Sequence, residues 1–180
     1  LLPEPGAAAS WSPDSSRTVY PCKLQPNGKW ADGKPVTAKQ WVDSWRRILD
    51  PATASKYSIM LAAVKGALAV EKAEAGKVQA ALDAVGIRAV DDLTLEITLA
   101  HDTPYFLEQL AHHATFCVRT DVIAANGDSW WTKPETLVGN GPFKLADYRA
   151  KKRVKVVPCE HYWARDKVKV VENGDKIAIV

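Results

Sequence analysis

NGKWADGKPVTAKQWVDSWRRILDP, residues 27–51, carries the strongest structural signals in this 180-residue chain. Its first part contains the turn dipeptides Asn27-Gly28 and Asp32-Gly33, in which glycine accepts a positive φ angle without a steric penalty. Thr37 and Gln40 follow with the three-residue spacing of a capping box, in which two side chains satisfy free N–H groups at the start of a helix. The segment therefore predicts turns over about 27–36 and a helix N-terminus at Thr37.

The helix that follows is amphipathic. Its apolar residues recur at offsets of 1, 4, 7 and 8 from the first, on one face of a helix with about 3.6 residues per turn: Trp41, Val42, Trp45, Ile48 and Leu49. Asp50 precedes Pro51, and a residue before proline is pushed out of the α region, so the helix should end there. We predict a helix over about 38–49, held against a sheet by its two tryptophans.

The middle of the chain predicts further helices and antiparallel strands. Apolar residues at helical spacing predict a helix over 56–73, with an interruption near Gly66 as the alternative. Thr103 followed by Pro104 is typical of the start of a helix over 104–112. Strict alternation of apolar and polar residues over 93–99, after a turn at 91–92, predicts an antiparallel hairpin with 87–90. The expected fold class is α/β and α+β-like, with a mixed, mostly antiparallel sheet and packed helices.

Two further strand regions carry turn signals. Pro21 removes a hydrogen-bond donor from a strand over 17–24, so that strand is expected at a sheet edge or with a bulge. The turn Gly139-Asn140-Gly141-Pro142 should lead into a strand over 143–148, followed by a strand over 153–157. Asn173-Gly174 predicts a hairpin between 168–171 and 176–180.

Composition excludes several classes of protein. Hydrophobic residues make up 47% of the chain and charged residues 25%, which are ordinary values for a globular domain. The net charge of +3 comes from interspersed opposite charges, so we expect no nucleic-acid partner. No apolar run approaches the ~18 residues of a membrane span. The chain is long enough to form one domain, or one domain and part of another.

Cysteine and histidine leave alternatives open. Cys22, Cys117 and Cys159 are either three buried free thiols or one disulfide with a third, unpaired thiol. His112-His113, together with Cys117, suggests zinc, but further ligands at a suitable spacing are missing. The other interpretation places the histidines at a helix C-terminus, where adjacent side chains diverge and cannot easily share a metal ion.

Motifs for catalysis are missing from the sequence. It contains no nucleophile elbow, no zinc-protease helix motif and no phosphate-binding glycine loop. Paired acids such as Asp91-Asp92 are explained by a turn. The sequence predicts no catalytic residues, no metal site, no cofactor and no enzyme activity.

Several sequence blocks nevertheless form a recognisable ordered set. The pattern W-x-D-G-x-P-V-T-A-x-x-W-V-x-S-W-R-R occupies 30–47 and is followed by DPATAS at 50–55. Further blocks are PYF at 104–106, WTKP at 131–134, GNGPF at 139–143 and YW at 162–163. Over about residues 5–163 this set resembles the extracytoplasmic solute-binding proteins of peptide ABC importers, a family that includes oligopeptide- and dipeptide-binding proteins.

The resemblance implies an architecture. It implies part of a periplasmic binding protein type II-like fold, in which residues 1–118 resemble the small second lobe and 119–180 a segment of the first lobe. Family members are more than twice this length, and a third lobe supplies the acid that pairs with the amino terminus of the peptide. We therefore expect this chain to be a fragment of a larger protein.

The resemblance also implies a function, namely the substrate-binding component of an ABC transporter that captures oligopeptides for import. The implied partners are a peptide ligand and a membrane ABC permease, and the implied state is a monomer. Tyr57 matches a tyrosine near the bound peptide, although Lys56 replaces the usual proline, and Asn140 matches the glycine-flanked asparagine of its motif. The alternative is an enzyme or interaction module that reuses this lobe.

The implied location is periplasmic or extracytoplasmic. Leu1-Leu2-Pro3 lacks the basic start and long apolar centre of a signal peptide. We expect the signal peptide, and any cysteine that carries a lipid anchor, upstream of this chain.

Overall fold

The structure is a computed structural model that describes residues 3–168, 170–173 and 176–179. Its contacts divide the chain into two compact units. The first unit comprises Leu1–Pro26 and Thr37–Thr120, and the second comprises Asn27–Val36 and Asp121–Val180. Assignment of 1–118 and 119–180 to two lobes of a larger protein stays a prediction.

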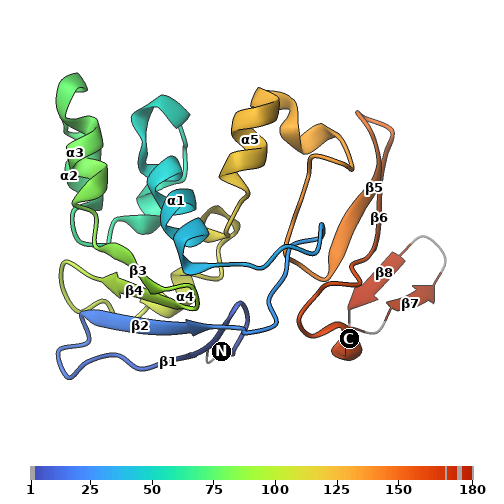
Figure 1. Ribbon diagram of the computed structural model, residues 1–180, viewed down its shortest axis with the longest axis horizontal. Helices are drawn as coiled ribbons and strands as arrows, with labels where there is room; N and C mark the ends of the chain where they lie inside the picture. Colours follow the sequence, from blue (N-terminus) through green and yellow to red (C-terminus); the bar gives the residue numbers. More distant parts are fainter. Residues whose placement is uncertain (1–2, 169, 174–175, 180) are drawn as a thin grey trace. The chain divides into compact units, whose positions relative to one another are not determined.

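The first unit contains a four-stranded antiparallel sheet with the strand order β1-β2-β4-β3 (Figure 1). Its strands are β1 (Ala8–Trp11), β2 (Val19–Leu24), β3 (Ile87–Asp91) and β4 (Thr94–Thr98). The predicted hairpin is present as β3 and β4. Leu95, Ile97 and Leu99 are buried, as the alternation predicted for one face of this strand.

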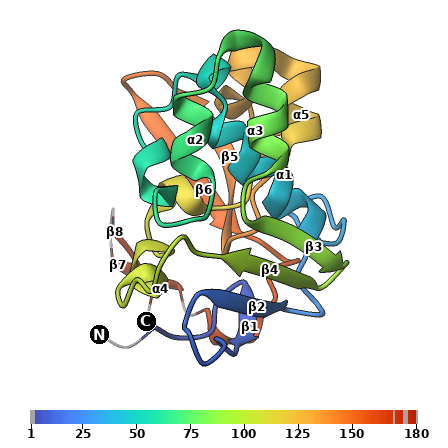
Figure 2. The ribbon, with the colours of Figure 1, turned by 90° about the vertical axis from the view of Figure 1, so that its left-hand side faces the viewer.

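Helix α1 (Ala38–Leu49) packs on β3 and β4 and has the predicted boundaries. Helices α1, α2 (Ala67–Glu71) and α3 (Val78–Asp83) lie together on one side of the sheet (Figure 2). Val42, Trp45 and Leu49 are buried, and Trp41 and Ile48 are partly buried against the same core. The capping box is also present, with Gln40 Oε1 accepting a hydrogen bond from Thr37 N at 2.9 Å.

We expect Thr37→Ala to lower the free energy of unfolding by about 1 kcal/mol, because alanine cannot act as a hydrogen-bonding N-cap. Chemical denaturation of the protein with and without the substitution measures this effect. Thr37→Ser keeps the hydroxyl group and should restore most of the loss. A Thr37→Ala protein as stable as the original would show that the cap contributes nothing.

A continuous helix over 56–73 is wrong, whereas the interruption near Gly66 is present. The segment forms a 3₁₀ turn at Ser58–Leu61 and the short helix α2, with Gly66 between them at a φ of +79°. Lys65 N donates to Thr98 O at 2.9 Å and Lys65 O accepts from Gly86 N at 2.8 Å. These bonds to the β3–β4 region hold Lys65 out of the helical hydrogen-bond pattern, so helical spacing of apolar residues did not produce one helix.

The predicted helix over 104–112 is also longer than the structure shows. Helix α4 covers only Phe106–Gln109, and a 3₁₀ turn follows at His113–Thr115. The Thr115 hydroxyl lies 2.9 Å from Leu110 O and 2.8 Å from His112 O, so it can satisfy carbonyl groups at the end of the helix. Thr115 is almost fully buried, and this tertiary position ends the helix early.

The expectation of an edge strand at Pro21 is wrong, because β2 lies inside the sheet between β1 and β4. β2 pairs with β4 without a register shift, whereas its ladder with β1 shifts register between Ala8 and Ser10 of β1. In an antiparallel strand the nitrogen and the carbonyl of one residue face the same neighbouring strand. Pro21 O accepts from Ser12 N at 3.3 Å, just beyond the end of β1. An N–H group at Pro21 would therefore face the chain just beyond the end of β1, where the pairing of β1 with β2 has already ended.

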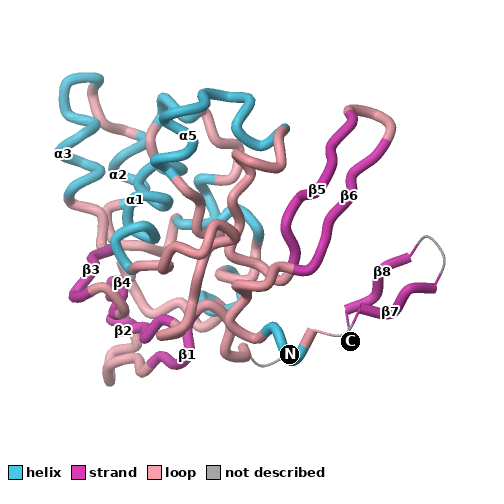
Figure 3. Tube along the Cα trace, turned by 45° about the vertical axis from the view of Figure 1, so that its right-hand side comes forward, coloured by secondary structure: helices cyan, strands magenta, loops and turns pink. Residues whose placement is uncertain are grey.

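In its described residues, the second unit contains helix α5 (Thr120–Asn126), 3₁₀ turns and two hairpins. Helix α5 leads into it from the end of the first unit, and a 3₁₀ turn follows at Gly127–Thr132. Figure 3 shows the hairpins, β5 (Phe143–Arg149) with β6 (Arg153–Pro158) and β7 (Val170–Asn173) with β8 (Lys176–Ile179). The glycine of the Asn173-Gly174 turn lies outside the described residues.

Other 3₁₀ turns complete the described chain at Pro51–Thr53, Ala75–Lys77 and Arg165–Lys167. Among the described helices, none has both the length and the apolarity needed to cross a membrane.

Candidate functional site

Tyr57 lies in an exposed group of rings in the first unit. Its side chain is 47% exposed, and its ring centroid lies 5.2 Å from that of His112 and 5.3 Å from that of His113. The two imidazole centroids are 4.2 Å apart. We call Tyr57, His112 and His113 the aromatic cluster. It joins the turn after α1 to the turn after α4.

The expectation that the two histidine side chains diverge is wrong, because the helix ends before it reaches them. His112 has an extended backbone, with φ −74° and ψ 135°, and its Nδ1 accepts from Ala114 N at 3.2 Å at the start of the next 3₁₀ turn. The predicted helix over 104–112 included His112, so sequence reasoning missed that the two histidines share a surface. Within the described residues, no three His, Cys, Asp or Glu side chains gather where they could hold a metal ion.

The aromatic cluster combines hydrogen-bonding groups with aromatic ring faces. Because Nδ1 of His112 accepts a hydrogen bond, the neutral ring carries its proton on Nε2, which is then a donor. The Tyr57 hydroxyl both donates and accepts, and the three ring faces can stack against apolar or aromatic groups. The cluster therefore offers hydrogen bonds and π surfaces together at an exposed position.

Asn140 belongs to the second unit, within a set of backbone contacts that joins several of the sequence blocks. Ala31 N donates to Gly139 O at 2.8 Å, and Cys159 N donates to Pro142 O at 2.8 Å. Asn27 Nδ2 donates to Trp163 O at 3.1 Å. The first two bonds join the glycine-rich turn at 139–142 to Ala31 and to Cys159, and the third joins the turns of 27–36 to Trp163. These contacts favour a structural role for this segment.

Tyr57 and Asn140, the two residues expected at a binding site, are thus in different units. The structure describes each within its own unit, and a role for either in binding a peptide stays a prediction.

The cysteines are free and buried, which supports the free-thiol interpretation. Burial raises the pKa of the Cys22 thiol to about 11 and that of the Cys117 thiol to about 12. Both thiols are therefore protonated at neutral pH and poorly reactive. Ser44 of α1 holds this segment, since its Oγ lies 3.5 Å from Cys117 Sγ, accepts from Val118 N at 2.9 Å and lies 3.0 Å from Val118 O.

The sequence model of the bacterial extracellular solute-binding proteins, family 5 Middle, matches residues 3–177. The chain belongs to this family. It is 38% identical over 172 residues to the periplasmic oligopeptide-binding protein OppA of Salmonella typhimurium, covering 95% of this chain and 30% of OppA. It is also 38% identical over 161 residues to the periplasmic murein peptide-binding protein MppA of Escherichia coli, covering 88% of this chain and 28% of MppA.

Solved structures confirm the fold class. The substrate-binding domain of an oligopeptide ABC transporter from Bacillus anthracis has a TM-score of 0.85 at 36% identity, with 92% of this chain and 31% of that one covered. Listeria monocytogenes OppA bound to peptide has a TM-score of 0.82 at 34% identity, with 93% of this chain and 32% of that one covered. The fold is that of the periplasmic binding protein type II-like peptide binders, and the chain spans about 30% of the length of these relatives.

Proposed function

We propose that the whole protein is the substrate-binding component of an ABC importer and captures oligopeptides. The relatives named above are peptide-binding proteins. Membership of a solute-binding family makes a binding protein the expected class of protein. The observation in this chain that best supports a peptide ligand is the exposed aromatic cluster around Tyr57. Binding a peptide requires hydrogen-bonding groups and apolar surface, and it requires no acid–base pair, so we propose that the protein is not an enzyme.

The proposed cellular setting follows from this role. The protein would bind the peptide outside the cytoplasm, as a monomer, and deliver it to a membrane ABC permease. A lipid anchor would be carried by a segment upstream of Leu1. Co-purification of the permease with the tagged protein, with peptide present and absent, tests the proposed partner.

We expect Tyr57→Ala to weaken binding of a mixture of tri- to pentapeptides by the whole protein about tenfold. A partly exposed aromatic contact at an interface contributes on the order of 1–2 kcal/mol, and about 1.4 kcal/mol corresponds to tenfold in affinity. Isothermal titration calorimetry measures the change.

Two matched variants separate a contact with the peptide from a general loss of structure. Tyr57→Phe keeps the ring and should retain most of the affinity. Tyr105→Ala removes another exposed tyrosine of the first unit, 60% exposed and outside the aromatic cluster, and should leave the affinity unchanged. Equal affinities for Tyr57→Ala and the original protein would contradict a role for Tyr57 in peptide binding.

A further inference from the structure

The first unit has a hollow between the C-terminal end of α1, the 3₁₀ turn at Ser58–Leu61 and helix α2. Its volume is about 190 Å³. We propose that this α1–α2 hollow binds an alkylammonium group, that is, a primary ammonium on a short hydrocarbon chain. The hollow shares no lining residue with the aromatic cluster, although its lining residues Ser55 and Ser58 stand on either side of Tyr57 in the chain.

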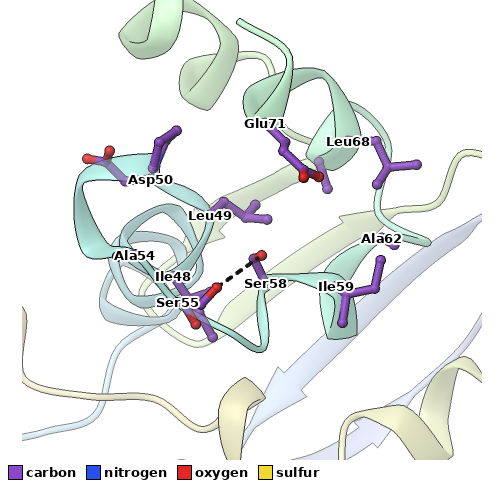
Figure 4. A pocket seen from close by; sticks show the side chains of 12 residues that line it. Ile48, Leu49, Asp50, Ala54, Ser55, Ser58, Ile59, Ala62, Leu68 and Glu71 are labelled. Carbon is purple, nitrogen blue, oxygen red and sulfur yellow. Dashed lines mark hydrogen bonds between the residues drawn. The ribbon is translucent and has the colours of Figure 1, made fainter.

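The walls of the hollow are apolar and open to solvent. Leu49 is buried at its base, whereas Ile59 and Leu68 are 58% and 47% exposed. Figure 4 shows Leu49 and Leu68 from the two helices and Ile59 from the turn around the same space. Large aliphatic side chains that stay exposed around one hollow favour a ligand with hydrocarbon to cover them.

The polar groups of the hollow select a cation. The Glu71 side chain extends from α2 toward the space between Leu49 and Leu68 (Figure 4). Within residues 3–168, where side chains are described, Glu71 forms no ion pair, and no Lys, Arg or His lines the hollow. An ammonium group is therefore attracted to this position, and an anion would be repelled.

Ser58 adds a second acceptor. Its hydroxyl donates to Ser55 O at 3.5 Å, which leaves the lone pairs of Ser58 Oγ available to accept from a ligand. Asp50 also lines the hollow, but its Oδ1 accepts from Ala52 N at 2.9 Å and its side chain points away from the space in Figure 4. Glu71 and Ser58 thus provide acceptors for the N–H donors of an ammonium group, beside the apolar walls.

An alkylammonium group can come from a free amine or from a lysine side chain, and two probes distinguish these sources. The whole protein, labelled with ¹⁵N, is titrated with cadaverine and, separately, with Nα-acetyl-lysine amide, while amide shifts are recorded by NMR. Nα-acetyl-norleucine amide, which lacks the ammonium group, is the control ligand. We expect saturable shifts confined to residues 48–71 with at least one of the two amines, at millimolar concentration, and none with the norleucine derivative.

Two substitutions and a matched control test the roles of charge and space. Glu71→Gln should weaken amine binding about fivefold, the size of a partly exposed ion pair. Glu108→Gln makes the same change at an exposed glutamate on α4, outside the hollow, and should have no effect. Ala62→Leu fills the hollow and should abolish the shifts, whereas peptide binding in the same samples shows that the protein is folded.

Several results would overturn the proposal. These are the absence of saturable shifts with both amines, equal binding of the norleucine derivative, or titration curves for Glu71→Gln that superimpose on those of the original protein. Binding by cadaverine alone would identify a free amine as the ligand, and binding by the lysine derivative alone would identify a lysine side chain.

Discussion

Replacing Trp45 by alanine is expected to lower the free energy of unfolding of the first unit by about 3–5 kcal/mol. The ring is 1% exposed and belongs to the main hydrophobic core with Val42, Leu49 and the inner residues of β4. Alanine would leave a cavity that the surrounding helix and sheet can only partly close. Hydrogen-exchange protection of α1 and β4 amides in the whole protein measures the loss within this unit.

A hydrogen bond adds to the cost of losing the ring. Trp45 Nε1 donates to Thr115 O at 2.9 Å, and both groups are buried, so the substitution leaves a carbonyl without its donor. Thr115 also supports the turn that carries His112 and His113. We therefore expect Trp45→Ala to disturb the aromatic cluster in addition to the core, visible as shifts of the Tyr57 and histidine ring signals.

Two controls separate these contributions. Trp45→Phe keeps one aromatic ring and part of the apolar contact but loses the N–H donor, so it should cost less than Trp45→Ala, about 1–3 kcal/mol. Trp131→Ala makes the same deletion at a ring that is 47% exposed in the second unit and should change the stability far less. If Trp45→Ala cost no more than Trp131→Ala, burial would not be the source of its stabilisation.

Peptide binding by these 180 residues alone is expected to be at least on the order of a hundredfold weaker than binding by the whole protein. The chain spans about 30% of the length of the OppA relative, so most of the protein that would surround the ligand lies elsewhere. Ordering a flexible peptide costs about 0.5–1.5 kcal/mol for each immobilised side chain. A partial site leaves much of the ligand in water and does not recover that cost.

Calorimetric titration of both proteins with tri- to pentapeptides measures the difference. Circular dichroism and amide protection of α1 must first show that the isolated chain is folded, so that weak binding is not the result of unfolding. Sub-micromolar binding by the isolated chain would show that the site lies wholly within these residues. That result would also contradict the proposed contribution of an acidic residue from a further lobe.

Local chemistry was enough to predict α1 and the β3–β4 hairpin. The Thr37–Gln40 cap, the periodic apolar face and the Asp50-Pro51 stop all act within a few residues of the helix they define. The alternation over 93–99 likewise describes one strand and its own neighbours. The ordered sequence blocks that resemble the family predicted the fold class and the peptide-binding family. The comparisons confirm both predictions.

Local patterns gave wrong predictions for segments whose conformation depends on hydrogen bonds with residues far away in the chain. Lys65 leaves the helical pattern because its backbone bonds to Thr98 and Gly86. Helix α4 ends early, where the hydroxyl of Thr115 reaches Leu110 O and His112 O just beyond the helix, and Thr115 O in turn accepts from Trp45 Nε1. Neither partner can be deduced from helical periodicity, because backbone groups bond wherever packing places a donor and an acceptor together. The same long-range packing brings the two histidines against Tyr57.

The sequence alone thus determined the class of fold, the first helix, the central hairpin and the family, because those features depend on neighbouring residues or on ordered motifs. Only the tertiary structure decided where the other helices end, why β2 tolerates Pro21 and which rings meet at Tyr57. Each of these depends on contacts between residues far apart in the chain, whose energies exceed the small local preferences that the sequence pattern reports.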